Sequence, residues 1–338
     1  MITATETETK ARASSSYTYN TIEAKLKRIN YDSKQIIEDF ILPRLEANPL
    51  WGIYHYSYNY YYNQLSGKQK NYYCIFEYNG DKILTVIHKV FHMRTAYNRL
   101  MGFPYSLANN VDNERVIFDV LFDEYIEQAY ISGVAIDRVD LAKYKKEEIV
   151  DEDYYINLSN REILDNKKYI KGQKVNHFLS DSDFSFRKIE LKDKEGIMAL
   201  YKAWGSHRPE KEPGKLSYQK YLDGFNQLTI YDKLLQYGMF YKDTIIALST
   251  FTPTIEGYCW GNMQWEYRTY DKIVMGNPQL SRIVSRSGKI LHYLCLVELH
   301  KLGMKFMSCS GAVKEEGLAQ HKRETFPHKI EYWLVKSD

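Results

Sequence analysis

The hydrophobic and polar order of the chain predicts two β-hairpins, one in each half. The first turn is Asn79-Gly80, a pair that accepts the positive φ angles of a tight hairpin turn. The second turn is Lys242-Asp243. The β-rich runs that flank the two turns are 72–78 with 82–87, and 238–241 with 244–248.

Each hairpin is followed, further along the chain, by a predicted helix that ends at a glycine and leads into a strand. The two sets are 116–132, Gly133 and 134–139, and 289–302, Gly303 and 304–307. A glycine just past a helix accepts the left-handed conformation that closes it. The repeated order predicts a duplicated unit. Two unrelated α+β halves are the alternative, because a hairpin plus a helix is a common combination.

A chain of 338 residues favours two domains, because single cores usually stop growing at about 250–300 residues. The junction is expected near residues 151–186, before a predicted strand at 184–189 and a predicted helix at 194–204. We predict an α+β (mixed α/β) fold in which each domain has a mixed, mostly antiparallel sheet flanked by helices. The predicted parts are a disordered tail at 1–25, an N-terminal domain at 26–165, a connecting segment at 166–185 and a C-terminal domain at 186–338.

Composition narrows the class of protein. A net charge of +3 and a pI near 8.3 permit nucleic acid as a partner but lack the strong basic character of a dedicated binder. The four cysteines show no CxxC pairing, so neither a metal site nor a disulfide framework is predicted. The polar N-terminus lacks a signal-peptide core, and no run approaches the ~18 apolar residues of a spanning helix. We expect a soluble, cytoplasmic protein without membrane insertion.

Tyrosine is frequent, with 31 Tyr against 14 Phe, and several tyrosines interleave in the segment 51–62. Interleaved aromatic rings can stack on single-stranded bases when basic residues lie nearby. This segment has no basic residue before Lys68, so packing between the two halves is the favoured interpretation.

The junction and the C-terminal end carry a pattern of aromatic and basic residues. Its members are Asp153-Tyr154-Tyr155, Lys167-Lys168-Tyr169, Lys174, Asn176, Phe178, Phe186-Arg187, 200–204, Gly317-Leu318, Lys322, Phe326-Pro327 and a strand at 329–335. This pattern resembles the phosphatidylglycerol lysyltransferase C-terminal-domain family, and the resemblance extends over residues 30–338. Two features depart from the family: its membrane domain is missing, and Ala319 stands where an arginine is usual.

The resemblance implies two acetyltransferase-like (GNAT) folds in tandem, in agreement with the duplicated pattern. It also implies transfer of an acyl or aminoacyl group, with acyl-CoA or aminoacyl-tRNA as co-substrate and no tightly bound cofactor. The best-known members move an amino acid from a charged tRNA onto a lipid. Without the membrane domain, we expect an amine acceptor on a small molecule, a peptide or a nucleic acid.

The segment before the second helix is the candidate donor-binding loop. Coenzyme-A-dependent relatives bind pyrophosphate at a helix N-terminus through Arg/Gln-x-x-Gly-x-Gly/Ala. Here Arg282 occupies the first position of that motif, but Ser285 and Ser287 occupy its two glycine positions, which argues against standard coenzyme A binding. The alternative is a surface turn with an ordinary helix start. The candidate residues are Arg282, Ser285, Arg286, Ser287, Gly288 and Lys289.

Glu266 is the candidate general base, in an aromatic-flanked strand predicted over 260–267. A carboxylate beside apolar rings has its pKa raised toward the working range. Alternation along the strand would instead place Glu266 on the solvent face. His321 and Lys322, in a helix predicted over 317–322, are the further catalytic candidates, Lys322 through the resemblance. A solvent-exposed charge is the alternative for His321.

The leading hypothesis is an acyltransferase that moves an acyl or aminoacyl group from a thioester or an aminoacyl-tRNA to an amine. The basic run at 167–174 would help to hold tRNA phosphates. One alternative is a non-catalytic binding protein with the same fold, favoured by the serines in the loop and by Ala319. Another is a nucleic-acid-binding module that uses the tyrosines and the basic run.

Overall fold

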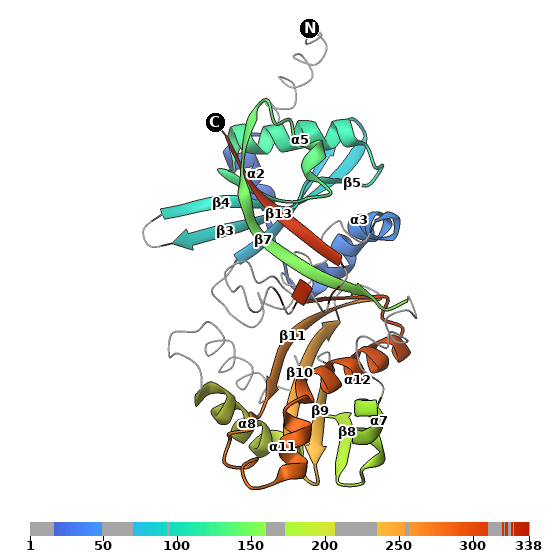
Figure 1. Cartoon of the computed structure of the whole chain (residues 1–338). Helices are drawn as coiled ribbons and strands as arrows, with labels where there is room; N and C mark the ends of the chain where they lie inside the picture. The colour runs from blue at the N-terminus through green and yellow to red at the C-terminus, as the bar shows by residue number, and fades with distance from the viewer. Residues whose placement is uncertain are drawn as a thin grey trace. The chain divides into compact units, whose positions relative to one another are not determined.

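The computed structural model describes residues 17–48, 70–92, 95–159, 173–206, 235–253, 257–309, 320, 322–323, 326 and 328–337 (Figure 1). The chain divides into two compact units. Unit 1 comprises Met1–Tyr154, Gly311–Glu324 and His328–Asp338, and unit 2 comprises Tyr155–Ser310 and Thr325–Pro327. This division differs from the predicted boundaries at the C-terminal end, because residues 328–337, expected in the C-terminal domain, lie in unit 1.

Unit 1 is built on a mixed sheet with the strand order β1-β2-β3-β4-β6-β13-β7, and β5 pairs with β3. The predicted first hairpin is confirmed as β2 and β3, joined at Asn79 and Gly80 with φ angles of 50° and 75°. β4 and β6 run parallel, whereas β6 and β13 run antiparallel. The strands are β1 (Lys27–Arg28), β2 (Lys70–Tyr78), β3 (Asp81–His92), β4 (Thr95–Met101), β5 (Tyr105–Ser106), β6 (Gln128–Ser132), β7 (Tyr144–Asn157) and β13 (His328–Ser337).

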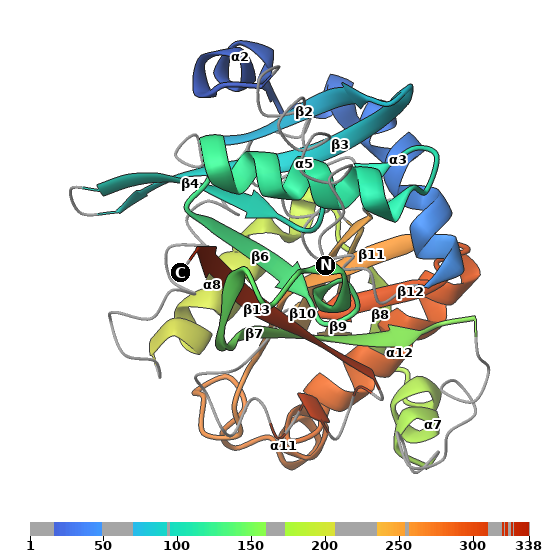
Figure 2. The ribbon, with the colours of Figure 1, turned by 90° about the horizontal axis from the view of Figure 1, so that it is seen from above.

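The helices of unit 1 include α5, which contacts β3 and β5 (Figure 2). Its apolar face buries Ile117, Phe118 and Leu121. The Asn110 side chain caps the helix by accepting from the N–H groups of Asp112 and Asn113, each at 3.1 Å. The helical segments described in this unit are α2 (Tyr19–Lys25), α3 (Lys34–Ala47) and α5 (Val111–Glu124), with short 3-10 turns at Tyr31–Ser33 and Ile136–Arg138.

Two parts of unit 1 differ from the sequence prediction. The helix predicted over 116–132 ends at Glu124, and residues 128–132 form β6 instead. Pairing with β4 on one side and β13 on the other overrides the helical pattern there. Gly133 therefore follows a strand rather than closing a helix. Within the predicted tail, residues 19–25 form α2, held by a buried Tyr17 whose hydroxyl donates to the carbonyl of Glu77 at 2.7 Å.

Unit 2 has the strand order β12-β11-β10-β9-β8, and neighbouring strands are antiparallel except for the parallel pair β11 and β12. The second predicted hairpin is confirmed as β9 and β10, with Lys242 at φ 51°. The strands are β8 (Phe184–Lys188), β9 (Leu235–Tyr241), β10 (Thr244–Pro253), β11 (Tyr258–Glu266) and β12 (Phe306–Cys309). The helices are α7 (Gln173–Ser180), α8 (Lys194–Ser206), α11 (Pro278–Val284) and α12 (Ser287–Lys301).

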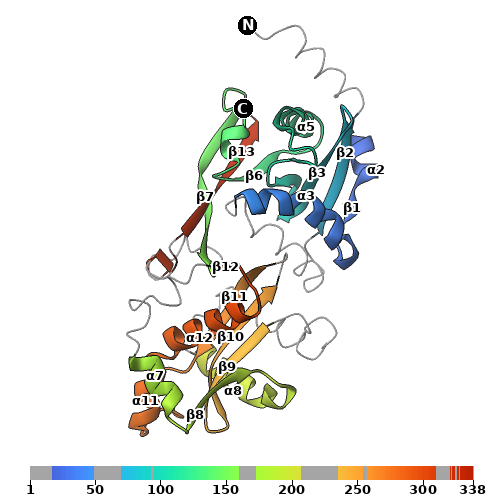
Figure 3. The same ribbon diagram turned by 90° about the vertical axis from the view of Figure 1, so that its right-hand side faces the viewer.

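The core of unit 2 is centred on β10. Every residue from 245 to 252 is buried, so both faces of this strand are covered. α8 and α12 both contact β10 (Figure 3). Gly303, with φ +81°, closes α12 just before β12, as the sequence predicts.

The two units repeat one order of elements. In unit 1 the order is β2, β3, β4, α5 and β6, and in unit 2 it is β9, β10, β11, α12 and β12. In each case an antiparallel hairpin and a third strand precede a helix that leads into a parallel partner of that third strand. The predicted duplicated α+β fold is therefore confirmed. Within the described ranges, no helix combines the length and the apolar character that crossing a bilayer requires.

Candidate active site

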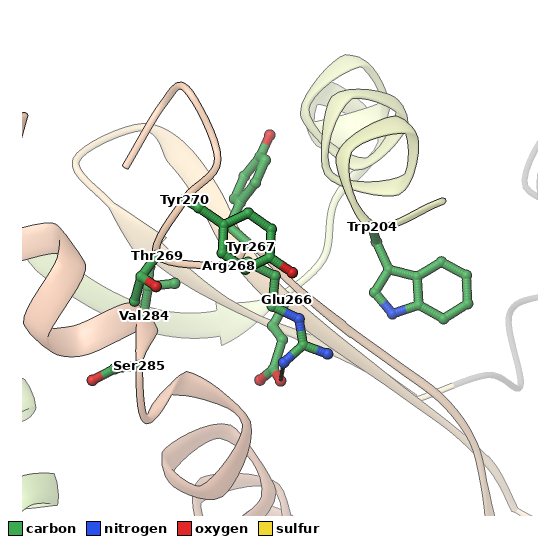
Figure 4. A pocket seen from close by; sticks show the side chains of 8 residues that line it. All are labelled: Trp204, Glu266, Tyr267, Arg268, Thr269, Tyr270, Val284 and Ser285. Atoms are coloured by element: carbon green, nitrogen blue, oxygen red, sulfur yellow. Dashed lines mark hydrogen bonds and ion pairs between the residues drawn. The ribbon is translucent and has the colours of Figure 1, made fainter. Parts of the chain in front are cut away.

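A cavity of about 420 Å³ opens in unit 2 where β11 ends (Figure 4). Its walls come from three places along the chain. Trp204 lines it from the end of α8, residues 266–270 from the end of β11 and the turn after it, and Val284 and Ser285 from the end of α11 and the residue after it. A pocket of this size, with aromatic and charged groups together, suits a small molecule or one end of a larger ligand.

Glu266, the last residue of β11, binds the start of α12. Its Oε2 atom accepts from the Ser287 hydroxyl at 3.3 Å, and its carboxylate also accepts from the backbone N–H of Gly288. Arg286, the N-cap residue of α12, makes no side-chain cap of its own. The carboxylate therefore satisfies one of the N–H groups that a helix start leaves without a partner.

Gly288 leaves room for this contact. A Cβ atom at this position would overlap Oε2 of Glu266 and would lie 2.8 Å from the side-chain nitrogen of Gln264. Both of these atoms are at the ends of flexible side chains, so a larger residue here would displace the carboxylate of Glu266 from the start of the helix.

Burial raises the pKa of the Glu266 carboxyl above its ordinary value. Three neighbours oppose this effect: Arg268, whose guanidinium lies 3.4 Å from Oε1, and the hydrogen bonds from Ser287 and Gly288. The side chain is 22% exposed, so it does not lie on the solvent face, the alternative that strand alternation offers.

The structure brings part of the predicted site together. Glu266, Ser287 and Gly288 are in contact, and Ser285 lines the same cavity. Arg282, Arg286 and Lys289 are exposed close by in the chain, in α11 and at the start of α12.

The described contacts do not connect the remaining two candidates with Glu266. Lys322 is buried and belongs to unit 1, whereas Glu266 belongs to unit 2. His321 lies outside the described residues, as do the tyrosine-rich segment 51–62 and most of the basic run at 167–174.

A β-bulge in β11 is a feature that the sequence reasoning missed. Gly261 and Met263 pair with the consecutive β10 residues Phe251 and Thr250, which leaves Asn262 as the extra residue. A bulged residue falls out of the hydrogen-bond ladder. The available signal was Gly261 itself, because an isolated glycine inside a strand pattern indicates a bulge or a close backbone approach.

The bulge lies just past the described pairing of the two parallel strands. β11 and β12 pair through three residue pairs, which end at Trp260 and Ser308. The described pairing therefore stops two residues before Asn262. Sequence reasoning also missed Arg268 and Tyr270, which directly follow Glu266 in the turn after β11, and Trp204, which the fold brings to the cavity from α8.

Comparison with known proteins identifies the fold. No family model and no curated protein matches the sequence. Among solved structures, a conserved protein of unknown function from Bacteroides thetaiotaomicron has a TM-score of 0.61 at 10% identity, covering 93% of this chain and 99% of that one. FemX has a TM-score of 0.52 at 7% identity, covering 82% of this chain and 90% of that one.

A third similar structure is the C-terminal domain of a protein named as a lysylphosphatidylglycerol synthetase from Agrobacterium fabrum. Its TM-score is 0.49 at 12% identity, covering 79% of this chain and 84% of that one. At such identities the likeness concerns the fold alone. The resemblance predicted from the sequence is confirmed at that level, and the chain has the predicted tandem GNAT-like fold.

Proposed function

We propose that this protein transfers an acyl or aminoacyl group from an activated donor to an amine. The observation that carries the proposal is the bulge at Asn262, just past the end of the pairing between β11 and β12. A backbone N–H outside the ladder can donate to the oxygen of an acyl carbonyl as that oxygen becomes an oxyanion.

The proposed reaction is an acyl substitution. The amine nitrogen attacks the acyl carbon, a C–N bond forms, and the C–O bond of an ester or the C–S bond of a thioester breaks. The amine loses one proton, and the leaving oxygen or sulfur gains one, so the reaction balances without a redox partner. Binding both substrates beside the bulge would supply proximity, and the bulge would supply charge stabilisation.

The contact between Glu266 and α12 supports an aminoacyl-tRNA donor over a coenzyme A thioester. The helix start that coenzyme-A-dependent relatives use for pyrophosphate already holds a carboxylate here. A phosphate in the same place would have to displace Glu266 from Ser287 and Gly288.

Glu266 itself is better suited to positioning than to proton transfer at the bulge. Asn262 and Glu266 are four positions apart along the extended strand, which is about 13 Å at about 3.3 Å per residue. We therefore assign Glu266 the role of holding α12 against β11. His321 and Lys322 stay as candidates for proton transfer or donor binding.

We place the reaction in the cytoplasm. Three of the four cysteines, Cys74, Cys259 and Cys295, are buried free thiols, as is usual in a reducing compartment. The proposed acceptor is an amine on a small molecule, a peptide or a nucleic acid.

Ligand binding is the first test. Acyl-coenzyme A, free coenzyme A, deacylated tRNA and aminoacyl-tRNA are compared as stabilisers of the purified protein against heat. A ligand at about 100 times its Kd adds about 2.7 kcal/mol to the free energy of unfolding, which gives a clear shift in Tm. We expect a shift with tRNA, and transfer of the aminoacyl group to an amine, detected by mass spectrometry.

Two substitutions at the bulge test the proposed chemistry. Asn262→Pro removes the backbone N–H, whereas Asn262→Ala keeps it. Loss of one oxyanion donor typically lowers kcat by about 10²–10³-fold, so the proline variant should lose activity and the alanine variant should keep it. Equal activity of the two variants at equal Tm would overturn the assignment. Absence of product from every donor would favour the non-catalytic binding protein.

A further inference from the structure

We infer that residues 267–289, named here the basic segment, bind single-stranded RNA at the 3′ end of the donor. This inference rests on the proposed function and names the donor surface for it. The basic segment comprises the turn after β11, α11 and the start of α12, all within unit 2.

In the basic segment the cationic side chains are exposed to solvent and the one acidic side chain is buried. Its five cationic side chains are all exposed. They are Arg268, Lys272, Arg282, Arg286 and Lys289. Its one acidic residue, Asp271, is 7% exposed and accepts from the backbone N–H of Arg268 at 2.5 Å.

The neighbouring acid is also turned away from solvent. Glu266 is largely buried on Ser287 and Gly288, and of the five cations the described contacts pair Arg268 alone with it. The outer surface of the basic segment is therefore positive, although the chain as a whole carries only +3. A local surface of this kind attracts a phosphate backbone.

Aromatic rings stand beside these charges. Tyr270, 56% exposed, lines the cavity with Arg268 and with Trp204 (Figure 4). Proteins that bind single-stranded nucleic acid combine a positive groove with rings on which bases stack. An anionic membrane would use the same charges, but it has no need of an aromatic-lined cavity of about 420 Å³. The cavity therefore favours a nucleotide.

The position along β11 agrees with a donor that reaches the bulge. The cavity begins at Glu266, about 13 Å along the strand from Asn262. A nucleotide held in the cavity and a phosphate chain on the basic segment would leave the esterified end free to extend along β11 toward the bulge at Asn262.

The test measures binding of fluorescent deacylated tRNA to the full chain over a range of salt concentrations. Lys272→Ala/Arg286→Ala removes two charges from the basic segment. Lys192→Ala/Lys301→Ala removes two exposed charges from elsewhere in unit 2, where the side chains are 68% and 64% exposed. The slope of log K against log salt should fall by about 1.4 for the first pair, at about 0.7 per phosphate contact, and stay unchanged for the second.

A second pair of variants tests stacking. Tyr270→Ala should weaken binding by about 5- to 150-fold, the equivalent of about 1–3 kcal/mol per stacked base, while Tyr270→Phe keeps the ring and the affinity. With a tRNA trimmed of its 3′-terminal nucleotides, the two variants should bind with equal affinity.

The outcomes test RNA binding by the basic segment separately from the proposed acyl transfer. Three results would overturn the inference: the wild type does not bind tRNA, the two double variants weaken binding equally, or the protein binds phosphatidylglycerol vesicles in place of tRNA. If tRNA binds as expected but no donor yields product, the inference stands and the proposed function fails. If acyl-coenzyme A yields product while tRNA does not bind, the proposed function stands and the inference fails.

Discussion

Gly288 lies against the carboxylate of Glu266, and this contact limits what each residue can be replaced by. Gly288→Ala places a methyl group on Oε2, so the flexible Glu266 side chain must shift and loosen its hydrogen bonds, a loss of about 1 kcal/mol that offsets the better helix propensity of alanine. In a Glu266→Ala background the same change should cost less. Urea unfolding of the four proteins in this double-mutant cycle measures the difference. Equal costs in both backgrounds would show that the two side chains do not meet.

The raised pKa of Glu266 predicts how stability depends on pH. The folded protein holds the Glu266 proton more tightly than the unfolded chain does, because burial raises the pKa above its ordinary value of 4.5. This contribution is complete below about pH 4.5 and is lost as the pH rises through the raised pKa. The stability of the wild type relative to Glu266→Gln should therefore fall as the pH rises from about 4.5 through the raised pKa. A relative stability that rises over this range in urea unfolding would contradict the direction of the shift.

At the scale of elements, a buried charge network joins α3, α5 and the 3-10 turn Ile136–Arg138. Glu114, fully buried on α5, pairs with Arg44 of α3 and with Arg138, the latter at 2.5 Å. It also accepts from the backbone N–H of Ser106 at 2.8 Å. Burial lowers the pKa of Arg44 to about 10, so its guanidinium is still charged at neutral pH.

Removal of the charge of Glu114 should destabilise unit 1 strongly. Glu114→Gln leaves two arginines facing each other without their shared carboxylate, and loss of one partner of a buried pair typically costs about 3–5 kcal/mol. Asp112→Asn on the same helix, where the side chain is 92% exposed, should cost less than about 1 kcal/mol. Chemical denaturation of both variants compares them, and similar losses would mean that the network adds little.

The elements differ in how far the sequence predicts them. The first hairpin follows from local turn chemistry, since Asn79-Gly80 accepts positive φ without outside help, whereas the second follows from the β-rich runs on either side of its turn, where Lys242 has a φ of 51°. The strand β6 does not follow from the local sequence, because it forms only by pairing with strands that are distant in sequence, including β13. The same reason applies to the candidate site. The sequence predicts Glu266 and the loop separately, but the contact between them and the position of Trp204 beside the cavity depend on the tertiary fold.

At the scale of the whole molecule, unit 1 contains a strand that follows unit 2 in the chain. β13 pairs with β6 from Tyr332–Ser132 to Lys336–Gln128, and it buries Ile330, Tyr332 and Val335. The ring of Tyr332 stacks on that of Tyr130, with centroids 5.1 Å apart. A charge placed on this strand should therefore loosen unit 1 and leave unit 2 intact.

Val335→Asp provides that charge, because Val335 is fully buried. An unpaired carboxylate in this position should speed amide hydrogen exchange in β4 and β6, while β9 and β10 keep their protection. Lys336→Ala, a neighbouring change at a half-buried position, should leave both units protected. Loss of protection in β9 and β10 together with β6 would show that the two units open as one.

The position of β13 also has a consequence for synthesis on the ribosome. Domains generally fold in the order in which they emerge, N-terminal first. Unit 1 cannot follow that order, because β6 lacks one of its two neighbours until all of unit 2 has been translated. The unit that is made first is thus completed last, and the exposed edge of β6 must be kept from wrong partners throughout translation of the intervening chain.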